Sequence, residues 1–139
     1  MKTAMLELPA TPEDVMRAVE RLQKFCREQE VSEKAIHALM LGVEELASNI
    51  VNHAYQNDAT KTFRMTMQHL GERFIVELRD HGPAFDPLQA APPDLEANAE
   101  ERELGGLGVH LARHYIDELD YSRSGDENVL RLTKHLLPA

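Results

Sequence analysis

The sequence holds one cysteine, few basic residues and no long apolar run. Cys26 has no second cysteine to pair with in the chain, so cysteine usage does not indicate an oxidising compartment, and we expect this thiol in or beside the core. No stretch approaches the roughly 18 apolar residues that a membrane span needs. The first residues include Glu7, Pro9 and Glu13 where a signal peptide would be apolar. The sequence therefore predicts a cytoplasmic protein without a membrane partner.

Positive charge is also scarce. Fifteen Lys and Arg residues against twenty-four Asp and Glu residues give a net charge of -9. A nucleic-acid or anionic-membrane partner is therefore not expected, because no basic stripe is left to neutralise phosphates. Proteins or small ligands are the expected partners.

The length of the chain predicts one domain over residues 1–139. A hydrophobic share of 42% in 139 residues is typical of a globular protein. A chain of this size buries about two-thirds of its unfolded surface in a single core. No internal repeat and no linker divides the sequence.

Residues 41–55 are the most informative stretch, because a polar row crosses an otherwise apolar helix. Each residue of an α-helix turns the chain by about 100°, so the apolar residues here gather into one buried stripe. Residues four apart are neighbours on a helix, so Glu45, Asn49 and His53 share one ridge. This spacing is weak evidence for a functional site by itself, and it becomes significant only if other segments complete the site.

The apolar periodicity predicts three helices. Thr11 and Ser32 are typical N-caps, so we expect helices over residues 12–29 and 33–55. A third helix is expected from Gly106.

Between and around these helices the period changes to 2, which predicts strands. The expected strands cover residues 4–8, 63–68, 74–79, 119–124 and 128–136. The order predicts an α+β fold, a two-layer α/β sandwich in which three helices cover one face of a mixed, mostly antiparallel sheet.

An aspartate stands at the end of one inward-facing strand row. Alternation places Asp80 on the same face as Phe74, Val76 and Leu78. A carboxylate buried there needs a donor. Gly82 lets the backbone turn away and leaves space that the amino group of a flat heterocycle could occupy. The alternative is an aspartate hydrogen-bonded within its own turn.

A glycine cluster precedes the third helix. Gly105, Gly106, Leu107 and Gly108 allow close backbone approach, and the first turn of a helix offers free amide groups to an anion. The preceding residues 83–104 are rich in proline and alanine and have no clear period. Loops of this length are usually functional lids or disordered, so the glycines could equally be a lid hinge.

Other nucleotide and hydrolase motifs are absent. The sequence has no G-x-x-x-x-G-K-S/T, no H-R-D loop and no H-E-x-x-H. It also has no phospho-acceptor helix of the sensor-kinase type, so it is not a complete histidine kinase.

The motifs that are present resemble a known family. E-x-x-x-N on a helix, D-x-G at a strand end, a proline-rich segment and G-G-x-G opening a helix resemble the Bergerat-type ATPase and kinase superfamily. The chain looks most like the stand-alone anti-sigma regulatory factors with serine/threonine protein kinase activity. The resemblance runs over nearly the whole chain, through ELPATPEDV, LGVEELASNIVNHAY, RDHGPAFDP, GGLGVHLARHYIDELDY and NVLRLTK.

The resemblance implies a histidine kinase-like, Bergerat-type fold that binds ATP and Mg²⁺. It implies that Glu45 is the catalytic base, that Asn49 coordinates Mg²⁺, and that Asp80 accepts a hydrogen bond from the adenine amino group. His53 would lie near the phosphates. The implied ATP-binding positions are Asn49, His53, Asp80, Gly82, Phe85, Gly105, Gly106, Leu107 and Gly108.

The expected function is an ATP-dependent serine/threonine protein kinase in a partner-switching system. Its partner would be an anti-sigma-factor antagonist, a sigma factor or both, and homodimerisation is expected from the resemblance only. The alternative is an ATP-gated protein-binding module without kinase activity, in which a lid ordered by ATP presents a surface to the partner.

Overall fold

The computed structural model describes residues 2–89 and 106–136. No helix within these residues is long and apolar enough to cross a membrane. The elements, in chain order, are β1 (Lys2–Pro9), α1 (Pro12–Glu28), α2 (Glu33–Asn49), the π-helix η1 (Ile50–Ala54), β2 (Thr62–Leu70), β3 (Arg73–Asp80), the 3-10 helix η2 (Pro87–Gln89), α4 (Gly106–Tyr115), β4 (Glu118–Ser124) and β5 (Glu127–His135).

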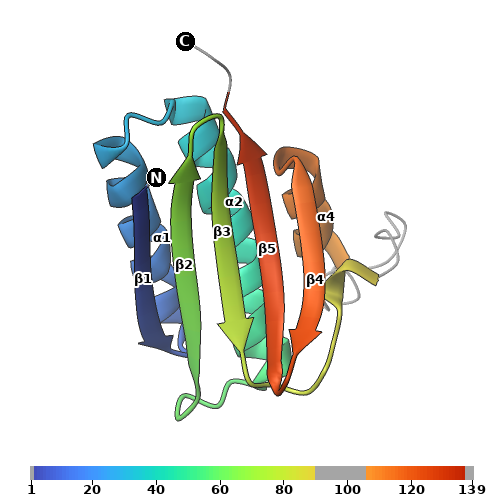
Figure 1. Cartoon of the computed structure of the whole chain (residues 1–139). Helices are drawn as coiled ribbons and strands as arrows, with labels where there is room; N and C mark the ends of the chain where they lie inside the picture. Colours follow the sequence, from blue (N-terminus) through green and yellow to red (C-terminus); the bar gives the residue numbers. More distant parts are fainter. Residues whose placement is uncertain (1, 90–105, 137–139) are drawn as a thin grey trace.

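The five strands form one sheet with the order β1-β2-β3-β5-β4, and the helices α1, α2 and α4 lie on one face of it (Figure 1). This confirms the predicted two-layer α+β sandwich. The expectation of a mixed sheet is corrected, because every pair of neighbouring strands is antiparallel. The crossover through α4 does make β4 run parallel to β3. However, β5 inserts between these two strands, so no parallel pair forms.

The core lies between the helices and the helix-facing side of the sheet. The predicted strand alternation is confirmed, since Met65 and Met67 of β2 and Phe74, Val76 and Leu78 of β3 are all buried. The apolar stripe of α2 packs on these rows and contributes Ile36, Leu39, Val43, Leu46 and Ala47. Cys26 is also buried, as expected, and burial raises the pKa of its thiol to about 12.

Both predicted helix starts are confirmed by their caps. The Thr11 Oγ1 accepts a hydrogen bond from the Asp14 backbone N–H at 3.1 Å, and the Ser32 Oγ accepts one from the Ala35 N–H at 3.2 Å. Each cap satisfies one of the amides that the first turn of a helix leaves free. The two caps fix where α1 and α2 begin.

The end of the second helix differs from the prediction. Regular α-helix ends at Asn49, and residues Ile50–Ala54 form a π-helix in which the Tyr55 N–H donates to the Ile50 carbonyl at 2.9 Å. Gln56 and Asn57 then adopt positive φ angles of 49° and 62°, which end the helix. Apolar periodicity over so short a segment does not distinguish one π turn from a continued α-helix.

The two ends of the sheet collect different segments. At one end, the C-terminal end of β3, the β4–β5 turn, the last turns of α2 and the N-terminal end of α4 come together (Figure 1). At the opposite end lie the β2–β3 turn, the connection from α1 to α2 and the last residues of β5 (Figure 1). Asp80 and the last turns of α2, which carry Asn49, belong to the first of these ends.

Candidate functional site

Asp80 is the buried acid of the site. It is the last residue of β3, is 2% exposed and continues the inward row of that strand, as predicted. Its Oδ1 accepts hydrogen bonds from the Gly82 backbone N–H at 2.8 Å and from Asn128 Nδ2 at 3.0 Å. Within the described residues, no donor is assigned to Oδ2. The carboxylate is therefore held through one oxygen.

The sequence allowed two interpretations of Asp80, a ligand-binding acid and an aspartate hydrogen-bonded within its own turn, and the observed hydrogen bonds are compatible with both. The bond from Gly82 is the local turn bond of the structural alternative. The bond from Asn128 comes from another strand and fixes the same oxygen a second time. A carboxylate fixed in this way remains able to accept a hydrogen bond at its other oxygen.

Gly82 brings the loop after β3 against the end of the second helix. A Cβ added at Gly82 would lie 2.9 Å from Asp80 Oδ1 and 3.0 Å from the Ala54 Cβ. Real Cβ atoms do not approach so closely, so a side chain at this position would push the loop and η1 apart. Asp80 and η1, which continues the helix that carries Asn49, therefore lie side by side.

Tyr55 fixes the same junction with two hydrogen bonds. Its hydroxyl donates to the Thr62 carbonyl and accepts from the His81 N–H, both at 2.7 Å. Burial raises the pKa of this hydroxyl, and the nearby charge of Asp80 adds to the rise. The neutral phenol therefore ties η1 to the beginning of β2 and to the end of β3. The sequence interpretation did not include Tyr55 in the site.

Asn128 was also missed. It lies directly opposite Asp80 in the register of β3 and β5, and it is 3% exposed. A polar residue that precedes the inward apolar residues Leu130 and Leu132 was a detectable signal, and it is the same signal that identified Asp80. The register that pairs the two residues could not be derived from the local pattern.

The polar row of the second helix lies beside this junction. Glu45 and Asn49 are partly buried on α2, and His53 is exposed on η1. Within the described residues, no hydrogen bond is assigned to any of these three side chains. Burial raises the pKa of the Glu45 carboxyl, and repulsion from Glu44 adds to the rise. None of the described residues therefore engages the row, and the raised pKa makes Glu45 a better proton acceptor than an ordinary glutamate.

The structure describes only part of the glycine cluster, residues 106–108. Gly106 is the first residue of α4, as expected, so Leu107 and Gly108 belong to the first turn. This end of α4 points toward the end of the sheet at which β3 stops (Figure 1). Gly105 and most of the proline-rich segment, residues 90–105, lie outside the described residues.

Phe85 follows Asp80 on the segment that leaves β3. Its side chain is 53% exposed, and its backbone N–H donates to Asn128 Oδ1 at 3.4 Å. The structure therefore connects this predicted ATP-binding position to Asp80 through the side chain of Asn128.

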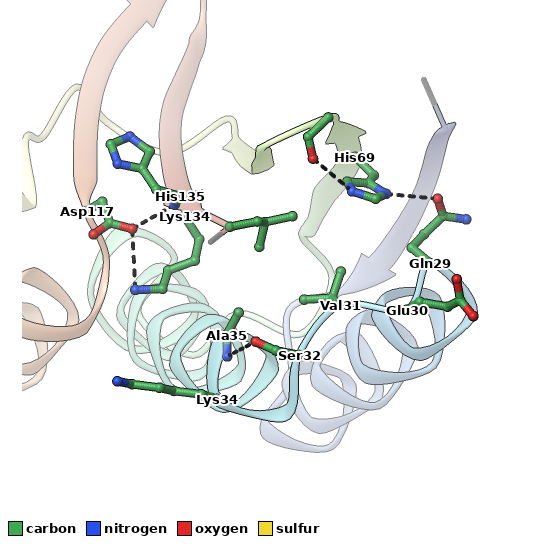
Figure 2. A pocket seen from close by; sticks show the side chains of 12 residues that line it. Gln29, Glu30, Val31, Ser32, Lys34, Ala35, His69, Asp117, Lys134 and His135 are labelled. Atoms are coloured by element: carbon green, nitrogen blue, oxygen red, sulfur yellow. Dashed lines mark hydrogen bonds and ion pairs between the residues drawn. The ribbon is translucent and has the colours of Figure 1, made fainter. Parts of the chain in front are cut away.

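A separate cavity lies at the opposite end of the sheet. It has a volume of about 860 Å³ and is lined by residues that include Ser32, Lys34, His69 and Lys134 (Figure 2). His69 is held between the Gln29 side chain and the Gly71 carbonyl at 3.1 and 3.2 Å. None of the predicted site residues lines this cavity.

Comparison with known proteins agrees with the geometry. A family model described as a histidine kinase-like ATPase domain matches residues 8–134. The chain is 31% identical over 137 residues to the serine/threonine-protein kinase BtrW of Bordetella bronchiseptica, which covers 99% of this chain and 96% of that protein. It is 27% identical over 95 residues to the anti-sigma F factor of Anoxybacillus flavithermus, which covers 68% of this chain and 65% of that protein.

A solved structure shows the same fold. A chain in the crystal structure of the SiaB-SiaC complex from Pseudomonas aeruginosa superposes with a TM-score of 0.70 at 16% identity, and the match covers 94% of this chain and 88% of that chain. The comparisons confirm the predicted family, the use of ATP and the enzyme class, a serine/threonine-protein kinase. The chain belongs to the histidine kinase-like ATPase domain family.

Proposed function

We propose that this chain uses Mg²⁺ and ATP to phosphorylate a serine or threonine of a partner protein, an anti-sigma-factor antagonist in a partner-switching system. The observation that carries the proposal is the contact at Gly82, where a Cβ would meet both Asp80 and Ala54. This contact supports the proposal because it brings Asp80 next to Ala54 of η1, which directly continues the helix that carries Glu45 and Asn49. The names of the relatives, a serine/threonine-protein kinase and an anti-sigma F factor, support the same function.

In this proposal, Asp80 accepts a hydrogen bond from the amino group of adenine. Gly82 leaves room for the flat ring, and Phe85 lies next to it. The proposed phosphate-binding positions are the backbone amides of the residues at the start of α4 and directly before it, together with a nearby imidazole: Gly105, Gly106, Leu107, Gly108 and His53. Free amides at a helix N-terminus suit an anion because the helix dipole adds to their donors.

The carboxamide of Asn49 would hold the metal. Its oxygen is a hard ligand of the type that Mg²⁺ prefers, and it has no assigned hydrogen bond within the described residues. Bound Mg²⁺ would neutralise negative charge that develops on the transferring phosphoryl group. Glu45, one helical turn earlier, would accept the proton of the attacking hydroxyl, and its raised pKa suits this role.

A protein partner fits the charge of the chain. A net charge of -9 opposes binding to nucleic acid. The structural neighbour was solved in a SiaB-SiaC complex, so a chain of this fold occurs in a complex with another protein. We propose an antagonist or a sigma factor as the partner of this chain. The homodimer and the cytoplasmic location stay predictions.

The test uses radiolabelled ATP, Mg²⁺ and candidate antagonists encoded near the gene. Glu45→Gln keeps the size of the side chain but removes the base, so it should bind ATP normally and lose phosphate transfer by about 100-fold or more. Glu33→Gln is the matched control, because Glu33 is an exposed glutamate at the start of the same helix and does not contribute to the raised pKa of Glu45. It should transfer phosphate at the wild-type rate.

Two results would contradict the kinase proposal. One is ATP binding without phosphate transfer to any of these candidates. The other is equal transfer by the wild-type protein and Glu45→Gln. Partner binding that requires ATP but is unchanged in Glu45→Gln, with no phosphate transferred, would identify an ATP-gated binding module instead.

A further inference from the structure

Asn128 connects the buried acid to the segment that leaves β3. Its Nδ2 donates to Asp80 Oδ1 at 3.0 Å and to the Pro83 carbonyl at 2.9 Å. Its Oδ1 accepts from the Phe85 N–H at 3.4 Å. The carboxamide thus pairs with the backbone of Pro83 and Phe85 as a neighbouring strand would, and it holds that segment against β5.

Two further side chains fix the orientation of this carboxamide. Tyr121 Oη and Arg123 Nη1 both donate to Asn128 Oδ1, the latter at 3.3 Å. A flipped carboxamide would direct its oxygen at Asp80 Oδ1 and its NH₂ group at the Arg123 guanidinium and the Phe85 N–H, which can only donate. That arrangement would bring acceptor to acceptor and donor to donor, so only one orientation is compatible with the surroundings.

Arg123 of β4 also holds the loop that follows β3. Its Nη1 also donates to the Gly82 carbonyl at 2.8 Å. Asn128 Nδ2 lies 3.4 Å from that carbonyl. The loop around Gly82 is therefore held from β4 and β5 as well as by its contact with Ala54.

These bonds determine which oxygen of Asp80 can serve a ligand. Oδ1 already accepts from the Gly82 N–H and from Asn128, which occupies both of its lone pairs. The carboxylate cannot rotate without breaking both bonds. Oδ2 is left in a fixed position as the acceptor for an exocyclic amino group.

We propose that Asn128, oriented by Tyr121 and Arg123, is a positioning residue that sets the preference of this site for adenine. It holds the carboxylate of Asp80 in one orientation and keeps residues 82–85 against β5. This inference rests on the proposed function, in which Asp80 recognises the adenine amino group. Asn128 acts through Asp80 and the backbone and need not touch the nucleotide.

The test compares ATP with purine riboside triphosphate, which lacks the 6-amino group, by calorimetry with Mg²⁺ present. The wild-type protein should prefer ATP by about tenfold or more, the usual worth of a hydrogen bond to a charged acceptor. Asn128→Ala should lose most of this preference through weaker ATP binding, with a smaller change for the analogue. Tyr121→Phe keeps the ring and should lose part of the preference.

Thr133→Val is the matched control. Thr133 is another buried polar residue of β5 and lies away from Asp80, so this variant should keep the wild-type ratio. If Asn128→Ala does not fold, Tyr121→Phe alone decides the question. Equal losses for ATP and the analogue would show a merely structural role and overturn the inference, as would an unchanged ratio. A wild-type protein that does not distinguish the two nucleotides would overturn the proposed adenine recognition and this inference with it.

Discussion

The two ends of the sheet use polar side chains in opposite ways. At the Asp80 end, Asp80 and Asn128 are almost fully buried and bond to each other and to the backbone. At the other end, Lys134 pairs with Asp117 at 3.3 Å (Figure 2), and His135 pairs with Glu118 at 2.9 Å. Both ends are rich in hydrogen bonds, but only the first removes them from water.

This difference determines how firmly each end holds its side chains. A buried polar group that loses its partner costs about 1–3 kcal/mol, because water cannot replace the lost bond. An exposed ion pair contributes about 0–1 kcal/mol, because water and salt compete with it. The buried network at the Asp80 end can therefore keep a carboxylate in one position for a ligand, and the exposed pairs cannot.

The largest effect is expected from Asp80→Ala. The variant removes the acceptor of both Asn128 Nδ2 and the Gly82 N–H and leaves two donors without their partner. We expect a loss of about 3 kcal/mol in the free energy of unfolding and no measurable ATP binding. Urea denaturation and calorimetry measure the two quantities. Retention of wild-type ATP affinity would exclude Asp80 from the nucleotide site.

The same substitution, glycine to alanine, can be made at one glycine near each end of the sheet, and the two variants should behave differently. Gly82→Ala introduces a Cβ 2.9 Å from Asp80 Oδ1, so we expect ATP affinity to fall by about tenfold or more and stability by about 1–3 kcal/mol. Gly71→Ala meets no atom within 4 Å, and its φ of 59° adds only backbone strain of about 1 kcal/mol. Gly71→Ala should therefore bind ATP normally. Similar ATP affinities for the two variants would contradict the proposed role of the Gly82 contact.

The smallest effect is expected from Asp117→Asn at the opposite end. Burial alone would raise the pKa of Asp117, but hydrogen bonds from the His135 N–H and from Lys134 outweigh it and lower the pKa. A lowered folded-state pKa stabilises the protein above the unfolded pKa, and this contribution disappears as the pH falls through the folded pKa. The variant should lose less than about 1 kcal/mol at neutral pH.

The pH and salt dependence of this variant provide its control. The stability difference between Asp117→Asn and the wild-type protein should shrink when the pH falls below the ordinary aspartate range, and also at high salt. ATP affinity should stay unchanged. A stability loss of several kcal/mol would show that this end is as tightly coupled as the Asp80 end.

Much of the fold was predictable because it depends on local pattern. The period of 2 placed Asp80 at the end of an inward row, and the structure finds it buried there. The capping residues placed the beginnings of α1 and α2, and Gly106 does open α4. These features follow from the side chains of a few adjacent residues, so the sequence shows them directly.

The partners of Asp80 were not predictable in the same way. Asn128 is separated from Asp80 by 48 residues, and the two meet only because β5 inserts between β3 and β4 in one particular register. The bonds of Tyr55 to Thr62 and His81 likewise depend on how the π-helix meets the two strands. Neither the Asp80–Asn128 pairing nor the hydrogen bonds of Tyr55 can be predicted from the local periodicity of the sequence.

The sequence by itself determined which residues face the core and where the helices begin, because burial and capping depend on residues that are close along the chain. Only the tertiary structure decided which strand lies beside β3 and therefore which side chain orients Asp80. That choice depends on the register of strands far apart in sequence, and a shift of one residue would turn Asn128 to the other face of the sheet.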